Sequence, residues 1–357
     1  MKTLLLILLL VLPGLAPGQV SDPDLATVRV PVADRGQGLR QDALREALAR
    51  VLVRMTGQRG APEHEELESM LRDPNRWLEH YGYGEDEDGE LMLEARFALP
   101  EITRYLRRAG APVWGATRPP LLLWLVDERG ALVGADLDPD DSLHRTLRER
   151  SGGRGLPLQL PDLDELEREE VAAADIRGRF DDRLLRASEG YGLPLLATAV
   201  FYPGAEPYVR WRLLQDDGEP LEEGRLRVDP EDGDTTAGLA AALVDRLADE
   251  VARHYAVTGT EDVRVPLRVE GLTSLADYAA FRAHTGDLAG VEDLAIRQLD
   301  GGVISAEVSF RGSPERLERL MRLHRQLGPC ETPDMRVGTH VPEENAGLRF
   351  CWRRDPE

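Results

Sequence analysis

The chain has 357 residues, and 65 acidic against 44 basic side chains give it a formal net charge of −21 at pH 7. So large an acidic excess repels nucleic acid and anionic lipid unless basic side chains are segregated. The sequence shows no basic cluster, so nucleic acid is not expected as a partner. Its single lysine, Lys2, lies in a segment expected to be removed, which excludes lysine-nucleophile and Schiff-base chemistry from the mature protein.

Residues 1–18 have the pattern of a cleavable signal peptide. Lys2 precedes an apolar run over residues 4–12, and helix-breaking and small residues follow up to Gly18. The run is too short for a membrane-spanning helix, and no cysteine near Gly18 offers a site for a lipid anchor. We therefore expect export, cleavage after Gly18, and a periplasmic protein with no transmembrane segment and no lipid anchor.

Residues 19–112 predict a small α+β domain. Residues 25–32 alternate as an edge strand, since Pro31 cannot donate a hydrogen bond inside a sheet. An amphipathic helix then runs from Leu39 to its stop at Gly57. The remaining expected elements are helices over 63–71 and from Pro74 through Trp77 and Tyr81, a hairpin from Tyr81 to Leu99, and a helix over 101–109.

Residues 113–258 predict a central three-layer α/β domain. The uninterrupted apolar run from Leu121 to Val126 is typical of a strand buried on both faces, and the preceding prolines fix where it starts. The expected elements after it are a helix over 140–150, a break at Gly152–Gly155, a strand over 156–160, helices over 162–170 and 181–189, strands over 195–202, 208–215 and 221–228, and a helix over 237–255. We predict a structural anchor around this strand, formed by Trp114, Gly115, Arg118, Pro119 and Trp124.

Residues 259–357 have the βαββαβ order of a ferredoxin-like domain. Asp300-Gly301-Gly302 is a hairpin signal between its two middle strands. The expected elements are strands over 263–269, 294–299, 303–311 and 348–352, with helices over 274–285 and 314–327. The whole chain is thus predicted to be a multidomain protein of the α+β and α/β classes.

No constellation of catalytic, metal-binding or cofactor-binding residues emerges from the sequence. Asp136 to Asp141 resembles the start of a calcium loop, but Asp141 replaces the turn glycine and Leu147 the bidentate glutamate, so we interpret it as a helix-capping loop. The Gly36-Gln-Gly38 segment lacks the third glycine of a dinucleotide motif. We predict no cofactor and no metal, and no catalytic residue is identified.

The two cysteines, Cys330 and Cys351, are predicted to form a disulfide in an oxidising compartment. Such a bond would join the last strand to the end of the preceding helix. Two alternatives are free thiols and a zinc site with His324 and His340, whose spacings match no common ligand pattern.

Several of these motifs resemble a known family. The helix from Leu39 to Gly57, Trp114-Gly115, Arg118-Pro119 and Leu123-Trp124-Leu125 are similar to the exported proteobacterial family called domain of unknown function 2066. That resemblance implies export and no assigned activity. In element order alone, the middle region is also similar to anticodon-binding-like domains of bacterial envelope proteins, such as the amino-terminal domain of the Tol-system propeller protein and the curli-secretion lipoprotein.

These observations favour a non-enzymatic adaptor or assembly accessory of the cell envelope that acts through contacts with envelope protein partners, as yet unidentified. The alternative is a periplasmic hydrolase or transferase whose carboxylates are gathered from distant loops. A cleft that holds two or more buried carboxyl groups would favour the enzyme, and flat apolar patches on the small domains would favour the adaptor.

Overall fold

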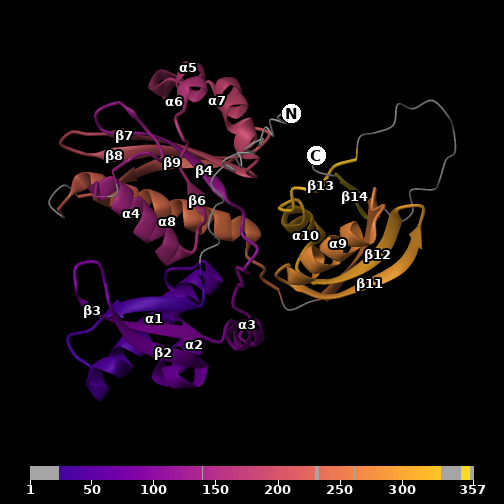
Figure 1. The fold of residues 1–357 in the computed structure, drawn as a ribbon, viewed down its shortest axis with the longest axis horizontal. Coiled ribbons are helices and arrows are strands. Elements are labelled where there is room, and N and C mark those ends of the chain that lie inside the picture. Colours follow the sequence, from indigo (N-terminus) through magenta and orange to yellow (C-terminus); the bar gives the residue numbers. More distant parts are fainter. Residues whose placement is uncertain (1–23, 139, 230–232, 260–261, 331–346, 354–357) are drawn as a thin grey trace, which may run out of the picture.

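The computed structural model describes residues 24–138, 140–229, 233–259, 262–330 and 347–353. The predicted signal peptide and His340 lie outside these residues. The chain folds as a mixed α/β protein with three β-sheets, each built from one successive stretch of sequence (Figure 1). We call these the first, second and third sheets, and each sheet together with the helices of its stretch the first, second and third unit.

The first sheet has the strand order β1-β3-β2, with the predicted strand β1 at its edge. Helix α1 packs a buried stripe against it and ends at Gly57, whose φ of 73° is left-handed. The elements are β1 (Thr27–Pro31), α1 (Gln37–Thr56), η1 (Ala61–Glu63), α2 (Glu65–Arg72), η2 (Pro74–Trp77), β2 (Leu78–Glu85), β3 (Leu91–Phe97) and α3 (Leu99–Arg108).

The helix expected from Pro74 through Tyr81 is wrong. Only the 3₁₀ turn η2 forms there, and Tyr81 lies in strand β2. The antiparallel ladder with β3 extends from Leu78 to Glu85, so pairing across the hairpin satisfies backbone groups that a helix would have satisfied locally.

The second sheet has the order β5-β4-β7-β8-β9, with β6 also beside β4. Strands β4, β6 and β7 are parallel, and β7, β8 and β9 form an antiparallel meander. The elements are β4 (Leu121–Val126), β5 (Leu132–Val133), α4 (Ser142–Arg154), β6 (Leu158–Gln159), α5 (Glu165–Glu170), α6 (Ala173–Gly178), α7 (Asp181–Ser188), η3 (Glu189–Tyr191), β7 (Leu195–Tyr202), β8 (Tyr208–Gln215), β9 (Pro220–Arg227) and α8 (Thr235–Tyr255).

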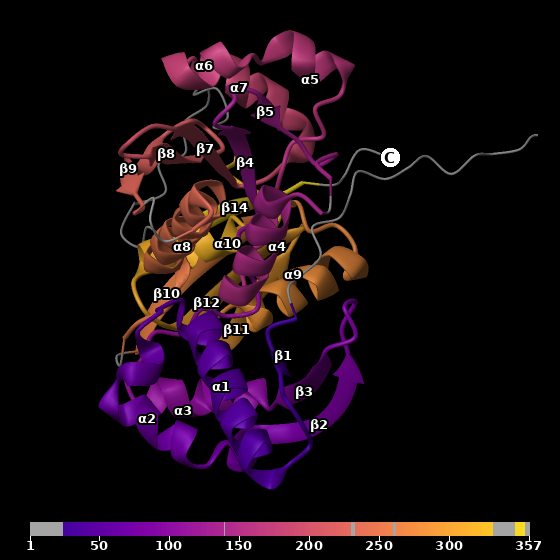
Figure 2. The same ribbon diagram turned by 90° about the vertical axis from the view of Figure 1, so that its left-hand side faces the viewer.

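Helices cover both faces of the second sheet. Figure 2 shows α4 and α8 between this sheet and the first unit, and α5, α6 and α7 on its far side. In β4, Leu121, Leu123 and Leu125 join the core formed with α4 and α8. The alternate side chains, including Trp124, join a second core with α6 and α7. All six residues of β4 are therefore buried, as the apolar run predicts.

The third sheet has the order β11-β12-β10-β14-β13. Helices α9 and α10 pack on one of its faces, and its other face carries charged side chains. The elements are β10 (Asp262–Glu270), α9 (Leu275–Asp287), β11 (Val291–Asp300), β12 (Val303–Arg311), α10 (Pro314–Met321), β13 (Leu327–Gly328) and β14 (Leu348–Trp352).

The direction of β14 differs from that of a ferredoxin-like unit. In a ferredoxin-like unit, the fourth strand follows a helical crossover from the third and therefore runs parallel to it. Here β12 is the third strand and is antiparallel to β10, so the fourth strand is expected to run antiparallel to β10. Instead β14 runs parallel to β10, with Leu267 opposite Leu348. Residues 327–328 already form the crossover strand β13, so the chain reverses before β14, which lies between β13 and β10.

Candidate functional site

The three units of the molecule come into contact at residues 113–119, which we call the joint. Val113 forms an antiparallel bridge with Val257, just after α8, and its backbone N–H donates to the Val257 carbonyl at 2.9 Å. The backbone N–H of Trp114 donates to the Met55 carbonyl at the end of α1, at 2.7 Å. At Gly115, a Cβ atom would lie only 2.7 Å from the Cβ of Ala289, which belongs to the third unit. The joint thus contacts all three parts of the molecule.

Arg118 is the buried centre of the joint. Its guanidinium carbon lies 4.1 Å from the centroid of the Trp114 ring. The same group donates to the Arg54 carbonyl at 2.7 Å and to the Gly155 carbonyl at 2.7 Å. These carbonyls lie at the ends of α1 and α4, so one cation serves two helix C-termini. The structure therefore places Trp114, Gly115 and Arg118 of the predicted anchor together, with Pro119 buried beside them and Trp124 inside β4.

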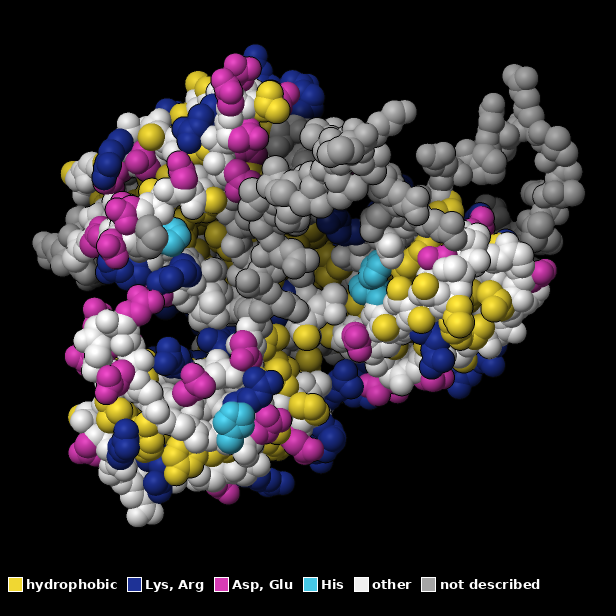
Figure 3. Space-filling model, viewed as in Figure 1, with side chains coloured by type: hydrophobic (Ala, Val, Ile, Leu, Met, Phe, Trp, Pro, Cys, Tyr) yellow, Lys and Arg dark blue, Asp and Glu magenta, His cyan; other side chains and the backbone are white. Residues whose placement is uncertain are grey.

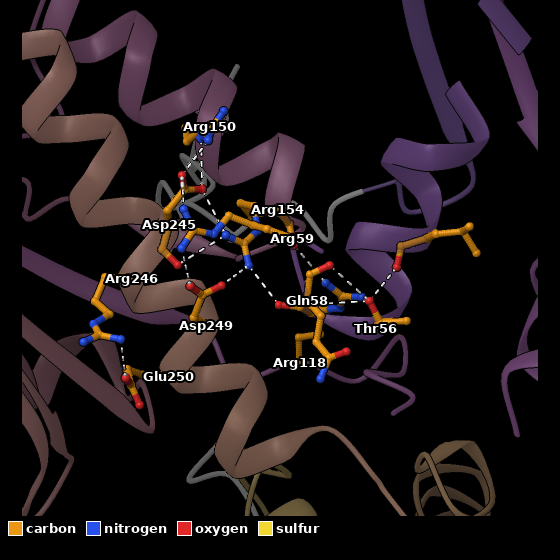
Figure 4. Close-up of polar contacts among 12 residues, drawn as sticks. Thr56, Gln58, Arg59, Arg118, Arg150, Arg154, Asp245, Arg246, Asp249 and Glu250 are labelled. Carbon is orange, nitrogen blue, oxygen red and sulfur yellow. Dashed lines mark hydrogen bonds and ion pairs between the residues drawn. The ribbon is translucent and has the colours of Figure 1, made fainter. Parts of the chain in front are cut away.

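A buried charge network lies beside the joint, between α4 and α8 (Figure 4). Arg154 donates to Asp245 at 2.9 Å and to Asp249 at 2.5 Å. Arg150 donates to Asp245 at 2.9 Å, and Arg59, just after α1, to Asp249 at 3.0 Å. Arg154 also donates to the Gly57 carbonyl at 2.9 Å. We call these five charged side chains the arginine-aspartate network, and it ties the first unit to the second.

The network keeps Asp245 ionised. Burial by itself raises the pKa of this carboxyl, but hydrogen bonds from Arg150 and Arg154 and their charges outweigh that effect and leave the pKa below its ordinary value. A general acid needs a pKa near the working pH. Asp245 is therefore a structural anion rather than a proton donor.

The network is not predicted from the sequence, because the glycines at 152, 153 and 155 predict that the helix ends before Arg154. That prediction is wrong: α4 continues through Gly152 and Gly153 to Arg154 and ends at Gly155, whose φ is 63°. Packing against α8 stabilises the last turn despite the low helix propensity of glycine. The signal that could have been used is the i, i+4 pairing of arginines at 150 and 154, matched by aspartates at 245 and 249.

A cavity of about 460 Å³ lies between the second and third units, and we call it the cleft. The second unit contributes the loop before β7, the start of that strand and the turn between β8 and β9. The third unit contributes the end of α10, the segment up to β13 and Arg353 after β14. A volume of this size at a boundary between units is typical of a ligand site.

The two walls of the cleft carry charges of opposite sign. Glu189, Asp216 and Asp217 line it from the second unit, whereas all four arginines of the lining come from the third unit: Arg319, Arg322, Arg325 and Arg353. Apolar side chains such as Leu193 and Leu323 lie between the charges. Elsewhere on the face seen in Figure 3, arginine and acidic side chains are interspersed over the described surface. No local pattern predicts the arginine wall, since no run of basic residues produces it.

The imidazole of His284, which lies against the cleft-lining His324, is poorly suited to proton transfer at neutral pH. The rings of His284 and His324 are 4.4 Å apart, and Trp352 lies against His324 with ring centroids 5.1 Å apart. Burial, followed by the charge of His324, lowers the pKa of His284 to about 4, despite an opposing backbone hydrogen bond. His284 is therefore uncharged at neutral pH.

Cys330 and Cys351 are joined as a disulfide, with Cα atoms 4.9 Å apart. Both sulfurs and the Glu270 carboxylate lie within 4.8 Å of one another, the geometry of a possible metal group. However, Glu270 accepts from Arg268 at 2.9 Å and Arg349 at 3.1 Å, and bonded sulfurs are poor ligands.

The double change Cys330→Ser/Cys351→Ser is expected to lower the stability of the third unit. The bond closes a loop with a sequence separation of 21 residues, which contributes about 3 kcal/mol in the chain-entropy model. Urea unfolding followed by circular dichroism measures the change, and reduction of the native protein serves as the control. Two titratable thiols in the unfolded, unreduced protein would contradict the bond.

Comparison with known proteins gives a partial match. Residues 20–115 match the family described as Domain of unknown function (DUF8605), which is a different family from the one that the sequence motifs resemble. No curated protein matches the chain. Among solved structures, the crystal structure of lipoprotein GNA1162 from Neisseria meningitidis covers 36% of this chain and 96% of its own, with 15% identity and a TM-score of 0.23. At that TM-score the likeness carries no argument.

Within the described residues, no helix combines the length and the apolar character needed to cross a bilayer.

Proposed function

We propose that the chain is an exported envelope protein that acts without catalysis, as an adaptor or assembly accessory, by taking part of a partner protein into the cleft. We also propose cleavage after Gly18, release into the periplasm, and domains over 19–112, 113–258 and 259–357. The relationship to domain of unknown function 2066, the anticodon-binding-like central domain and a ferredoxin-like last domain that has β14 inserted as an additional strand belong to the same proposal.

The distribution of charged side chains between the arginine-aspartate network and the cleft supports a binding function over a catalytic one. The most deeply buried carboxylate of the arginine-aspartate network, Asp245, is held ionised by arginines, which removes it from acid–base chemistry. The cleft, in contrast, offers charged side chains around an apolar lining. Such a surface suits a polypeptide segment, which carries apolar side chains and charges together.

Site-specific cross-linking tests this proposal. A photoreactive residue at position 193, which lines the cleft, is expected to give a discrete adduct with a partner protein in the exporting cell. The matched control places the same group at position 275, where Leu275 is 81% exposed on α9 and outside the cleft lining. Equal adducts from both positions, or none from position 193, would contradict an adaptor that uses the cleft.

One observation favours the alternative of a hydrolase or transferase. Burial, followed by the neighbouring charge of Asp217, raises the pKa of Asp216 in the cleft, as a catalytic acid requires. However, the burial of Asp216 is only partial, because both aspartates lie on the exposed turn between β8 and β9, which leaves them loosely positioned for catalysis. A hydrolytic activity lost in Asp216→Asn and retained in Glu149→Gln would favour the enzyme.

A further inference from the structure

One of the four arginines in the cleft wall, Arg319, has a buried donor atom without a hydrogen-bond partner. The Nε atom of Arg319 is buried and has no hydrogen-bond partner, and among the described residues its guanidinium forms no ion pair. The side chain is half-buried at the end of α10 and lines the cleft beside Tyr255 at the end of α8. A buried donor without a hydrogen-bond partner is costly, so this part of the cleft is suited to an anionic ligand that accepts a hydrogen bond there.

The other arginines of the wall are positioned differently. Arg322 pairs with Glu318 at 2.6 Å and also interacts with Asp216 across the cleft. Arg325 lies against Gly192, where a Cβ atom would approach its Nη2 to 3.0 Å. Arg322 and Arg325 are exposed side chains whose contacts join the two units, whereas the Nε atom of Arg319 is buried. The anion is therefore expected to bind at Arg319, with Arg353 on the same wall.

The opposite wall restricts the charge of that anion. Glu189, Asp216 and Asp217 repel a phosphate dianion or a polyanion much more strongly than a single carboxylate. The leucine and proline side chains of the lining, among them Leu193, Pro194 and Leu323, require an apolar body next to the anionic group. A carboxyl-terminal residue with an apolar side chain meets both conditions, and recognition of a free C-terminus is a known mode of peptide binding.

We propose that the cleft binds the free carboxyl-terminal end of a polypeptide, with the carboxylate on Arg319 and an apolar last side chain among Leu193, Pro194 and Leu323. This inference rests on the proposed adaptor function, and it assigns the chemistry of the partner segment. An arginine–carboxylate contact of this kind combines charge with directed hydrogen bonds.

The test is calorimetric titration of the processed full chain with two probes, N-acetyl-alanyl-alanyl-leucine as the free acid and as its amide. The free acid is expected to bind at least about tenfold more tightly than the amide, since a hydrogen bond to a charged group is lost. Arg319→Gln is expected to remove this preference. The control Arg282→Gln, which makes the same charge change on exposed α9, is expected to keep it.

Three results would overturn the proposal: no binding of the free acid at millimolar concentration, equal binding of acid and amide by the native protein, or an unchanged preference in Arg319→Gln. Displacement of the acid by equimolar inorganic phosphate would also overturn it, because the site would then select a free oxyanion. The acid–amide comparison uses the native protein, so it holds even if Arg319→Gln folds poorly. If position 193 gives a cross-linked adduct but the titration shows no preference for the free acid, the proposed adaptor function is supported and the assignment of a carboxyl-terminal ligand is wrong.

Discussion

Trp124→Ala is expected to destabilise the second unit by about 3–5 kcal/mol, a large share of the ~5–15 kcal/mol that a domain typically has. Trp124 is fully buried at the centre of β4, in the core that α6 and α7 cover. Its indole N–H donates to Ser188 on α7 at 3.0 Å, so the change removes both packing and a hydrogen bond. Urea unfolding followed by circular dichroism measures the loss.

Phe180→Ala is the matched control for that experiment. Phe180 is 60% exposed just before α7, and truncation of an exposed aromatic side chain typically changes stability by less than about 0.5 kcal/mol. An unchanged midpoint for Trp124→Ala would mean that the residue is exposed in solution and would reopen it as a binding-surface aromatic.

Asp245→Asn is expected to cost about 3 kcal/mol, because it leaves Arg154 buried without the more deeply buried of its two counterions. Asp249 still pairs with Arg154, which keeps the loss at the lower end for a broken buried ion pair. The first unit is expected to loosen from the second, since the same network holds Arg59. Hydrogen exchange at the end of α1 and in α4 measures this loosening.

The native protein is also expected to lose this contribution in acid. The folded pKa of Asp245 lies below its ordinary value of about 4. Stabilisation by this group is therefore complete above that ordinary value and disappears as the pH falls towards the folded pKa. Asp245→Asn removes this part of the pH dependence, whereas Glu149→Gln, on the exposed face of α4, retains it. Parallel pH–stability curves for the native protein and Asp245→Asn would contradict the assignment.

The elements that could be predicted from the sequence are those whose cause is local. The apolar run of β4 specifies a strand buried on both faces whatever surrounds it, and Gly57 specifies the end of α1 through its left-handed φ. The acidic loop before α4 behaves as expected, since Asp141 accepts a hydrogen bond from the Leu143 N–H.

The features that could not be predicted depend on partners distant in sequence. Gly152 and Gly153 are poor helix formers, and only the packing of α4 on α8 makes that turn helical. Arg154 and Asp245 are 91 residues apart in sequence, so no local pattern joins them. The cleft is a boundary between two units, and the opposite signs of its walls follow from their docking rather than from any motif.

The place of β14 in the third sheet also determines when that sheet can be completed during synthesis of the chain. Strand β10 has β12 on one side and β14 on the other, and β14 is the last described strand along the chain. Until residues 348–352 leave the ribosome, one edge of β10 presents unpaired amides and carbonyls that another extended chain could bind. The strands of the first two sheets all end by Arg227, so those sheets can form while the third is still open. A nascent chain of this protein therefore has an unpaired strand edge until late in translation, and binding of a chaperone at that stage would prevent its pairing with other chains.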